Sequence, residues 1–139
     1  MPILNANHLF DQGEKLVVTP AGGVPRQVDL RRAISAAYYG LFHFCLTAVA
    51  DEFVGVSQRQ TSRYALVYRS VDHRTLKDLC VEAKKQTLPA KYRPYLPPDG
   101  FGADLQAFSM SAIDQQEKRH LADCNPPTAL HKVGCEVCG

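Results

Sequence analysis

The sequence predicts an all-α fold, a bundle of four or five helices. Apolar residues recur at helical spacing in several segments of the chain. Alanine, the strongest helix former, occurs repeatedly between residues 30 and 53. Proline and glycine are concentrated in two stretches, residues 17–27 and 91–102, which are therefore expected to be loops. With 139 residues, 45% of them hydrophobic, the chain can bury a core without disulfides or metals.

The first two helices are expected on either side of the first loop. Residues 2–16 form an amphipathic segment that predicts the first helix. Asp29 is expected to cap the second helix, because its side chain can accept from the exposed amides of a first turn. This helix should continue to about residue 53.

Three further helices complete the predicted fold. Thr61 or Ser62 should begin a third helix that ends near residue 69, and Asp72 should cap a fourth that continues to about residue 86. Helical spacing predicts a last helix that ends near residue 123, because the Asn-Pro-Pro that follows cannot continue it. Two parts are expected: a helical domain over residues 1–126 and a short tail over residues 127–139.

Composition predicts a cytoplasmic protein outside the membrane. The N-terminal segment lacks the basic and apolar regions of a signal peptide, and no apolar run reaches the roughly 18 residues of a membrane span. Five cysteines, odd in number and scattered, indicate reduced thiols. A net charge of +2 is compatible with nucleic-acid contact without requiring it.

Three polar side chains of the second helix lie on one face, and we call them the polar seam: Arg32, Tyr39 and His43. They are spaced by seven and four residues, so they fall within roughly 40° of one another on a helical wheel. The rest of this helix is apolar nearly all round, which predicts a central place in the bundle.

Two interpretations of the polar seam are open. In a structural role, Arg32 reaches solvent while Tyr39 and His43 bond to a neighbouring helix, because buried polar groups need partners. In a functional role, the seam lines a cleft or a subunit interface that holds a phosphate or a base.

A second polar cluster ends the last helix with Lys118, Arg119, His120 and Asp123. His120 and Asp123 are three residues apart and can touch on one face. A carboxylate beside an imidazole suits general acid–base chemistry. The alternative is a solvated helix end, where basic side chains are favoured by the helix dipole.

Three segments resemble the successive signatures of bacterial HEPN-domain proteins: LRRAISAAYYGLFHF, YRSVDHRTLKDLC and QQEKRHLADCNP. The resemblance spans residues 4–126. It implies an all-α up-and-down bundle, commonly a homodimer, in a family rich in RNA-processing and toxin–antitoxin proteins. Active members are metal-independent endoribonucleases built around Arg-x4-6-His, often encoded beside a minimal nucleotidyltransferase, which is the implied partner.

The resemblance also implies roles for the two polar clusters. Arg119, His120 and Asp123 would be catalytic, with the polar seam across from them binding RNA or nucleotide. His120 would act as acid or base toward the 2′-hydroxyl, and Arg119 would neutralise the phosphate, so no cofactor is expected. The sequence departs from the catalytic spacing, because three residues separate Arg69 from His73 and Arg119 directly precedes His120.

The C-terminal segment TALHKVGCEVCG departs from the family as well. Relatives usually continue with another amphipathic helix, and we expect this last helix to be missing. Cys135 and Cys138 are spaced as zinc ligands, which Cys124, His120 or His131 could complete. Structural zinc sites usually comprise two such pairs, so no metal is expected here.

Three classes of function follow from these observations. The first is a metal-independent ribonuclease or toxin component. The second is a non-catalytic module that binds nucleotide, RNA or a partner nucleotidyltransferase. The third is a structural helical protein whose polar seam satisfies itself. Two polar clusters in one chain favour an RNA-related function, whereas the altered Arg–His spacing leaves catalysis open.

Overall fold

A computed structural model describes residues 4–18, 23–85, 87, 89–91, 93–95, 100–124, 129–130 and 137–138. The helices are α1 (Ala6–Val17), α2 (Gln27–Phe53), α3 (Ser62–Ser70), α4 (His73–Ala83) and α5 (Ala103–Cys124), with short 3-10 turns at Val56–Gln58 and Arg93–Tyr95. Near the C-terminus the two-residue strands β1 (Ala129–Leu130) and β2 (Val137–Cys138) pair antiparallel. The prediction of an all-α fold is confirmed.

Local capping chemistry sets most helix starts. The Asn5 side chain accepts from the amide of Asn7 and begins α1. The predicted start of α3 and the predicted cap of α4 are confirmed: Thr61 accepts from the amide of Tyr64 just before α3, and Asp72 accepts from that of Thr75. The start of the first helix expected at residue 2 lies outside the described residues.

The predicted cap of α2 is wrong. Arg26 occupies the N-cap position and makes no side-chain cap, while Asp29 lies inside the first turn. The Asp29 carboxylate instead accepts from Nε of Arg26 at 2.8 Å. Its negative charge still suits a helix N-terminus, so the residue acts one turn later than a cap would.

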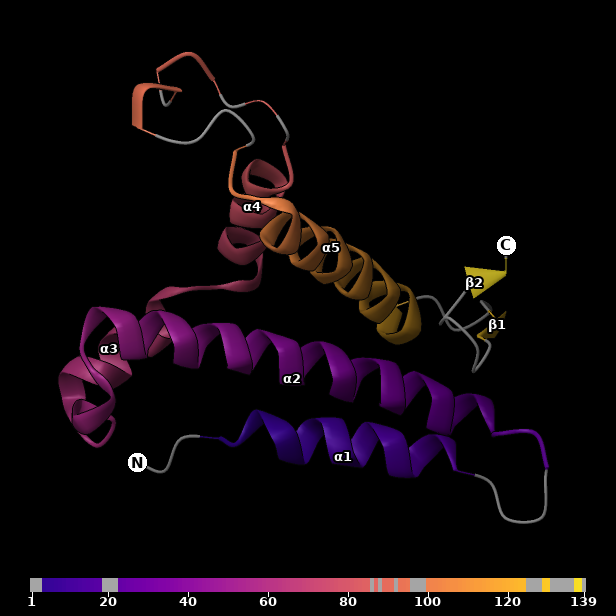
Figure 1. The fold of residues 1–139 in the computed structure, drawn as a ribbon. Helices are drawn as coiled ribbons and strands as arrows, with labels where there is room; N and C mark the ends of the chain where they lie inside the picture. The colour runs from indigo at the N-terminus through magenta and orange to yellow at the C-terminus, as the bar shows by residue number, and fades with distance from the viewer. Residues whose placement is uncertain are drawn as a thin grey trace.

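The long helix α2 is the centre of the molecule, as its apolar surface predicts. Helix α1 runs along one side of it and α5 crosses its other side, with α4 packed against α5 (Figure 1). Helices α1 and α2 approach closely at Gly40, where an added Cβ would lie 2.8 Å from the Phe10 ring. Glycine is therefore required there by the neighbouring helix rather than by its own backbone.

Two clusters of buried side chains hold α2 in place. Leu30 and Ile34 pack on Ala122 of α5. Tyr38, Phe42 and Leu46 form the second cluster, against which side chains from α3 and the start of α4 pack. By packing in this way, the two clusters set the rotation of α2 against α3, α4 and α5. This rotation decides which of those helices the polar groups of α2 face.

By length and composition, α2 is apolar enough to cross a membrane. Half of its most apolar stretch is buried inside the protein, as in the core helix of a folded domain. Other apolar side chains of α2 are exposed, with 56% of Phe44 and 81% of Phe53 accessible.

Candidate functional site

The six predicted site residues of the two clusters lie in three separate hollows. One hollow, of about 390 Å³, brings together Arg32 and Tyr39 of the polar seam with Asp123. A second is lined by His43, and a third by Arg119 and His120. The polar seam is divided because Arg32 and His43 are eleven residues apart, about 16 Å along a helix, although they share a face.

The hollow that contains Arg32 lies where α1, α2 and α5 meet. On its α5 side Asp123 accepts a hydrogen bond from the Ser35 hydroxyl at 2.5 Å. The Arg31 guanidinium donates from Nη1 to the carbonyl of Ala122 at 2.7 Å and ties α2 to the end of α5. Arg32 is exposed and makes no hydrogen bond or ion pair with the residues that the structure describes. Its charge is therefore directed to the solvent at the mouth of this hollow.

Arg119 is held against two aromatic rings of α2. Its guanidinium carbon lies 5.1 Å from the centre of the Tyr38 ring and 5.8 Å from that of Tyr39, within cation–π range. Its Nη1 lies 3.6 Å from the Asp123 carboxylate. The Nε atom is buried and has no hydrogen-bond partner among the described residues. One donor of this guanidinium is thus still unsatisfied in the described part of the protein.

His73, the first residue of α4, was not among the predicted site residues, yet it lies at the centre of this cluster. Its Nδ1 is 2.7 Å from the Tyr38 hydroxyl, and its ring stacks on Phe42 with centroids 4.0 Å apart. Burial, followed by the charge of Arg119, lowers the pKa of His73 below its ordinary value of 6.5. His73 is therefore neutral at pH 7, when an imidazole can accept a proton.

A sequence signal for His73 exists. It follows the Asp72 cap and stands four positions after Arg69, an Arg–His pair that is one residue shorter than the family spacing. The short Arg–His spacing kept His73 off the list of predicted site residues. Its contact with Tyr38, 35 positions earlier in the sequence, is visible only in the folded chain.

His120 does not form the predicted pair with Asp123. The Asp123 carboxylate contacts Ser35 and Arg119, whereas the exposed His120 lines a hollow with Lys77 and Glu117. Successive helix residues project about 100° apart, so Arg119 points inward when His120 points outward. The expected His120–Asp123 acid–base pair is therefore wrong within the described residues.

His43 forms its own pair with a tyrosine of α3. Its Nδ1 lies 2.6 Å from the Tyr68 hydroxyl, and the two rings are nearly parallel. Burial lowers the pKa of His43. The His43–Tyr68 hydrogen bond therefore lies at the hollow between α2 and α3, which Arg119 does not line.

Metal chemistry has no ready ligand set in the described part of the chain, where no three His, Cys, Asp or Glu side chains gather. The cysteine pair considered for zinc, Cys135 and Cys138, has side chains outside the described residues. The two described thiols, Cys45 and Cys80, are buried and reduced.

Taken together, the α2–α5 face presents an exposed arginine, a half-buried tyrosine and a second arginine with an unsatisfied donor. We call Arg32, Tyr39 and Arg119 the basic–aromatic face. Aromatic rings can stack on bases and guanidinium groups bind phosphate oxygens. Comparison of the chain with family models, curated proteins and solved structures found no match.

Proposed function

We propose that this chain is a HEPN-like domain that binds single-stranded RNA on its basic–aromatic face. The observation that carries the proposal is the position of Arg119, held over Tyr38 and Tyr39 with a buried Nε that has no partner among the described residues. A phosphate oxygen is an acceptor for the accessible part of this guanidinium side chain, 19% of which is exposed, whereas the buried Nε lies out of its reach.

The other members of the face supply the remaining contacts of an RNA strand. Tyr39 offers a half-buried ring on which a base can stack. Arg32, seven residues earlier in α2, presents an exposed charge for a neighbouring phosphate. The Asp123 carboxylate, 3.6 Å from Nη1 of Arg119, offsets part of its charge toward any anion, so Arg32 is the less compensated cation of the face.

Binding is tested with a labelled single-stranded RNA followed by fluorescence anisotropy. Arg32→Gln and Arg119→Gln should each weaken binding about tenfold, which corresponds to about 1.4 kcal/mol. Each variant should also flatten the salt dependence of binding, because one phosphate contact is lost. Arg63→Gln is the matched control, since Arg63 is exposed on α3 outside the basic–aromatic face. Equal affinity of Arg32→Gln, Arg119→Gln and Arg63→Gln would remove the proposal.

Metal-independent RNA cleavage is a second candidate, and His73 favours it. Its Nδ1 is engaged by Tyr38, which leaves Nε2 for the transfer of a proton. The neutral imidazole lies in the same cluster as Arg119, so a proton acceptor and a phosphate-binding cation are close together.

A further inference from the structure

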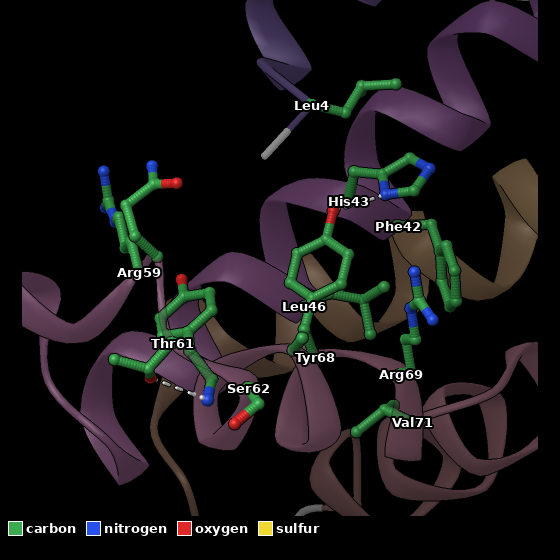
Figure 2. A pocket seen from close by; sticks show the side chains of 13 residues that line it. Leu4, Phe42, His43, Leu46, Arg59, Thr61, Ser62, Tyr68, Arg69 and Val71 are labelled. Carbon is green, nitrogen blue, oxygen red and sulfur yellow. Dashed lines mark hydrogen bonds between the residues drawn. The ribbon is translucent and has the colours of Figure 1, made fainter. Parts of the chain in front are cut away.

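The hollow where α1, α2 and α5 meet, which we call the junction hollow, brings a carboxylate next to an aromatic ring. Its volume is about 390 Å³, within the size range of small-molecule sites, and its lining includes Tyr39 of α2 and Asp123 of α5. His43, the third member of the polar seam, takes no part in it, because that side chain faces the hollow between α2 and α3 (Figure 2). The junction hollow therefore offers a ligand one ring to stack on and one acidic group beside that ring.

Two contacts locate the Asp123 carboxylate relative to the Tyr39 ring. Its Oδ1 accepts from the Ser35 hydroxyl at 2.5 Å, and Ser35 lies four residues, about one helical turn, before Tyr39 on α2. Its Oδ2 lies 3.6 Å from Nη1 of Arg119, whose guanidinium carbon is 5.8 Å from the centre of the Tyr39 ring. The carboxylate is thus held beside the ring from two directions. A group that the fold already holds in place loses little freedom when a ligand binds, so its direction can select among ligands.

The Asp123 carboxylate keeps hydrogen-bonding capacity for a ligand. An ionised carboxylate only accepts hydrogen bonds, and its two oxygens together have about four lone-pair positions. Oδ1 uses one position for Ser35 and Oδ2 faces Arg119, so each oxygen retains a position for a further donor. The Asp123 side chain is exposed, which makes these positions accessible from solvent. A ligand that matches both oxygens must present two neighbouring N–H donors.

Among the four RNA bases, guanine alone has such an edge, because its ring N1–H and its 2-amino group are adjacent donors. Adenine and cytosine place an amino group beside a ring nitrogen that is an acceptor. Uracil places its single N–H between two carbonyl oxygens. An acceptor directed at the carboxylate is repelled, so these three bases can use only one of the two oxygens well.

We propose that the junction hollow selects guanine, with the base stacked on Tyr39 and its N1–H and 2-amino group donating to Asp123. This selectivity rests on the proposed function, because it names the base of a strand that the basic–aromatic face binds. Arg32, at the mouth of the same hollow, attracts the phosphates of any strand. Affinity and base preference therefore come from different residues and can be measured separately.

Fluorescence anisotropy of labelled RNAs tests the preference. An oligouridine with one central guanosine is compared with the same strand carrying adenosine, cytidine or uridine at that position. The guanosine strand should bind the full chain about tenfold more tightly than the other three, since a bidentate contact discriminates between bases by this order. Inosine lacks only the 2-amino group, so a strand with inosine at that position should lose part of the preference.

Asp123→Asn should remove the preference for guanosine and favour adenosine. The amide oxygen of asparagine accepts from the 6-amino group of adenine, and its N–H donates to ring N1. Asp114→Asn removes one negative charge from the same helix outside the junction hollow and should keep the guanosine preference. Plain oligouridine should bind Asp123→Asn at least as tightly as the natural chain, because a negative charge is lost, and this binding shows that the variant is folded.

Equal binding of the four strands, or a guanosine preference that Asp123→Asn retains, overturns guanine selection. If the four strands bind equally and Arg32→Gln weakens them all, RNA binding stands without base selection. Absence of binding to every strand removes the proposed function, and guanine selection with it.

Discussion

The Tyr38 hydroxyl and Nδ1 of His73 lie 2.7 Å apart, and this hydrogen bond joins the middle of α2 to the first residue of α4. Only 1% of Tyr38 is exposed, so its hydroxyl depends on this partner rather than on solvent. Burial raises the pKa of Tyr38 to about 12, which keeps the hydroxyl protonated across the physiological range.

Tyr38→Phe should lower the free energy of unfolding by about 1–2 kcal/mol, because it removes one partner of a buried hydrogen bond and leaves the imidazole unpaired. Urea denaturation measures the change. Tyr39→Phe is the control, since the Tyr39 hydroxyl has no hydrogen bond among the described residues, and its effect should stay below about 0.5 kcal/mol. Equal effects of the two variants would mean that the Tyr38–His73 bond does not stabilise the fold.

The stability of the protein should fall as the pH decreases from about 7.5 to 5. Burial lowers the pKa of both His43 and His73 in the folded chain from 6.5, so the unfolded chain binds more protons as the pH falls through that value. The stability contributed by these neutral imidazoles is present above pH 6.5 and is lost below it. Thermal melts at several pH values measure this. A His43→Asn, His73→Asn double variant keeps an acceptor near each Nδ1 position and should show a flatter profile, and an equally steep profile would contradict the assignment.

Gly40→Ala should have opposite effects in two backgrounds. In the natural chain the added methyl group meets the Phe10 ring, and overpacking of about 1–3 kcal/mol exceeds the gain in helix propensity of about 1 kcal/mol. In a Phe10→Ala background only the propensity gain remains, so the same change should raise the unfolding free energy. A double-mutant cycle in urea gives both values. Additive effects would show that α1 and α2 do not pack at this glycine.

If the protein cleaves RNA, it should do so with a chelator present, and the proton should pass through His73. His73→Asn should then reduce the rate by about 10²–10⁴. His120→Ala should change the rate little, because His120 is exposed on the outer side of α5. A labelled RNA incubated with each variant tests both statements. Loss of cleavage on His120→Ala alone would return the acid–base role to the residue that the family resemblance implies.

Self-association should occur through the exposed apolar side of α2. Phe44, with 56% of its surface accessible, is the large apolar residue of α2 to change first. Sedimentation at tens of micromolar should show a dimer, as expected for a weak affinity of this order. Phe44→Glu should give a monomer, whereas Leu66→Glu, equally disruptive of an exposed apolar residue on α3, should not. A monomeric natural chain would exclude the homodimer that the resemblance implies.

The elements of this fold were largely predictable because their determinants are local. Thr61 and Asp72 cap helices within three residues of themselves, and Ala-rich periodicity identifies α2. Asp29 was misjudged because capping depends on where the backbone turns helical, and the chain does so at Gln27. Whether the bundle belongs to the HEPN family stays a prediction.

The site was less predictable because its contacts join distant segments. A helical wheel groups Arg32 with His43 by angle, yet it takes no account of the distance between them along the axis. His73 was missed because its importance comes from Tyr38 and Phe42, which lie more than thirty positions earlier in the chain. The inward direction of Arg119 and the outward direction of His120 depend on how α5 is rotated against α2, which periodicity does not fix for a helix with polar residues on several sides.

The uninterrupted length of α2 restricts how this chain can change over evolutionary time. The helix carries Ser35 and Tyr39 on the α5 side and His43 and Leu46 at the hollow between α2 and α3. Deletion of one residue between Ser35 and His43 would rotate everything beyond it by about 100° and shorten the helix by about 1.5 Å. Both sites would lose their alignment at once, whereas a single substitution disturbs only one of them. Lineages of this protein should therefore accumulate replacements within α2 but insertions and deletions only outside it.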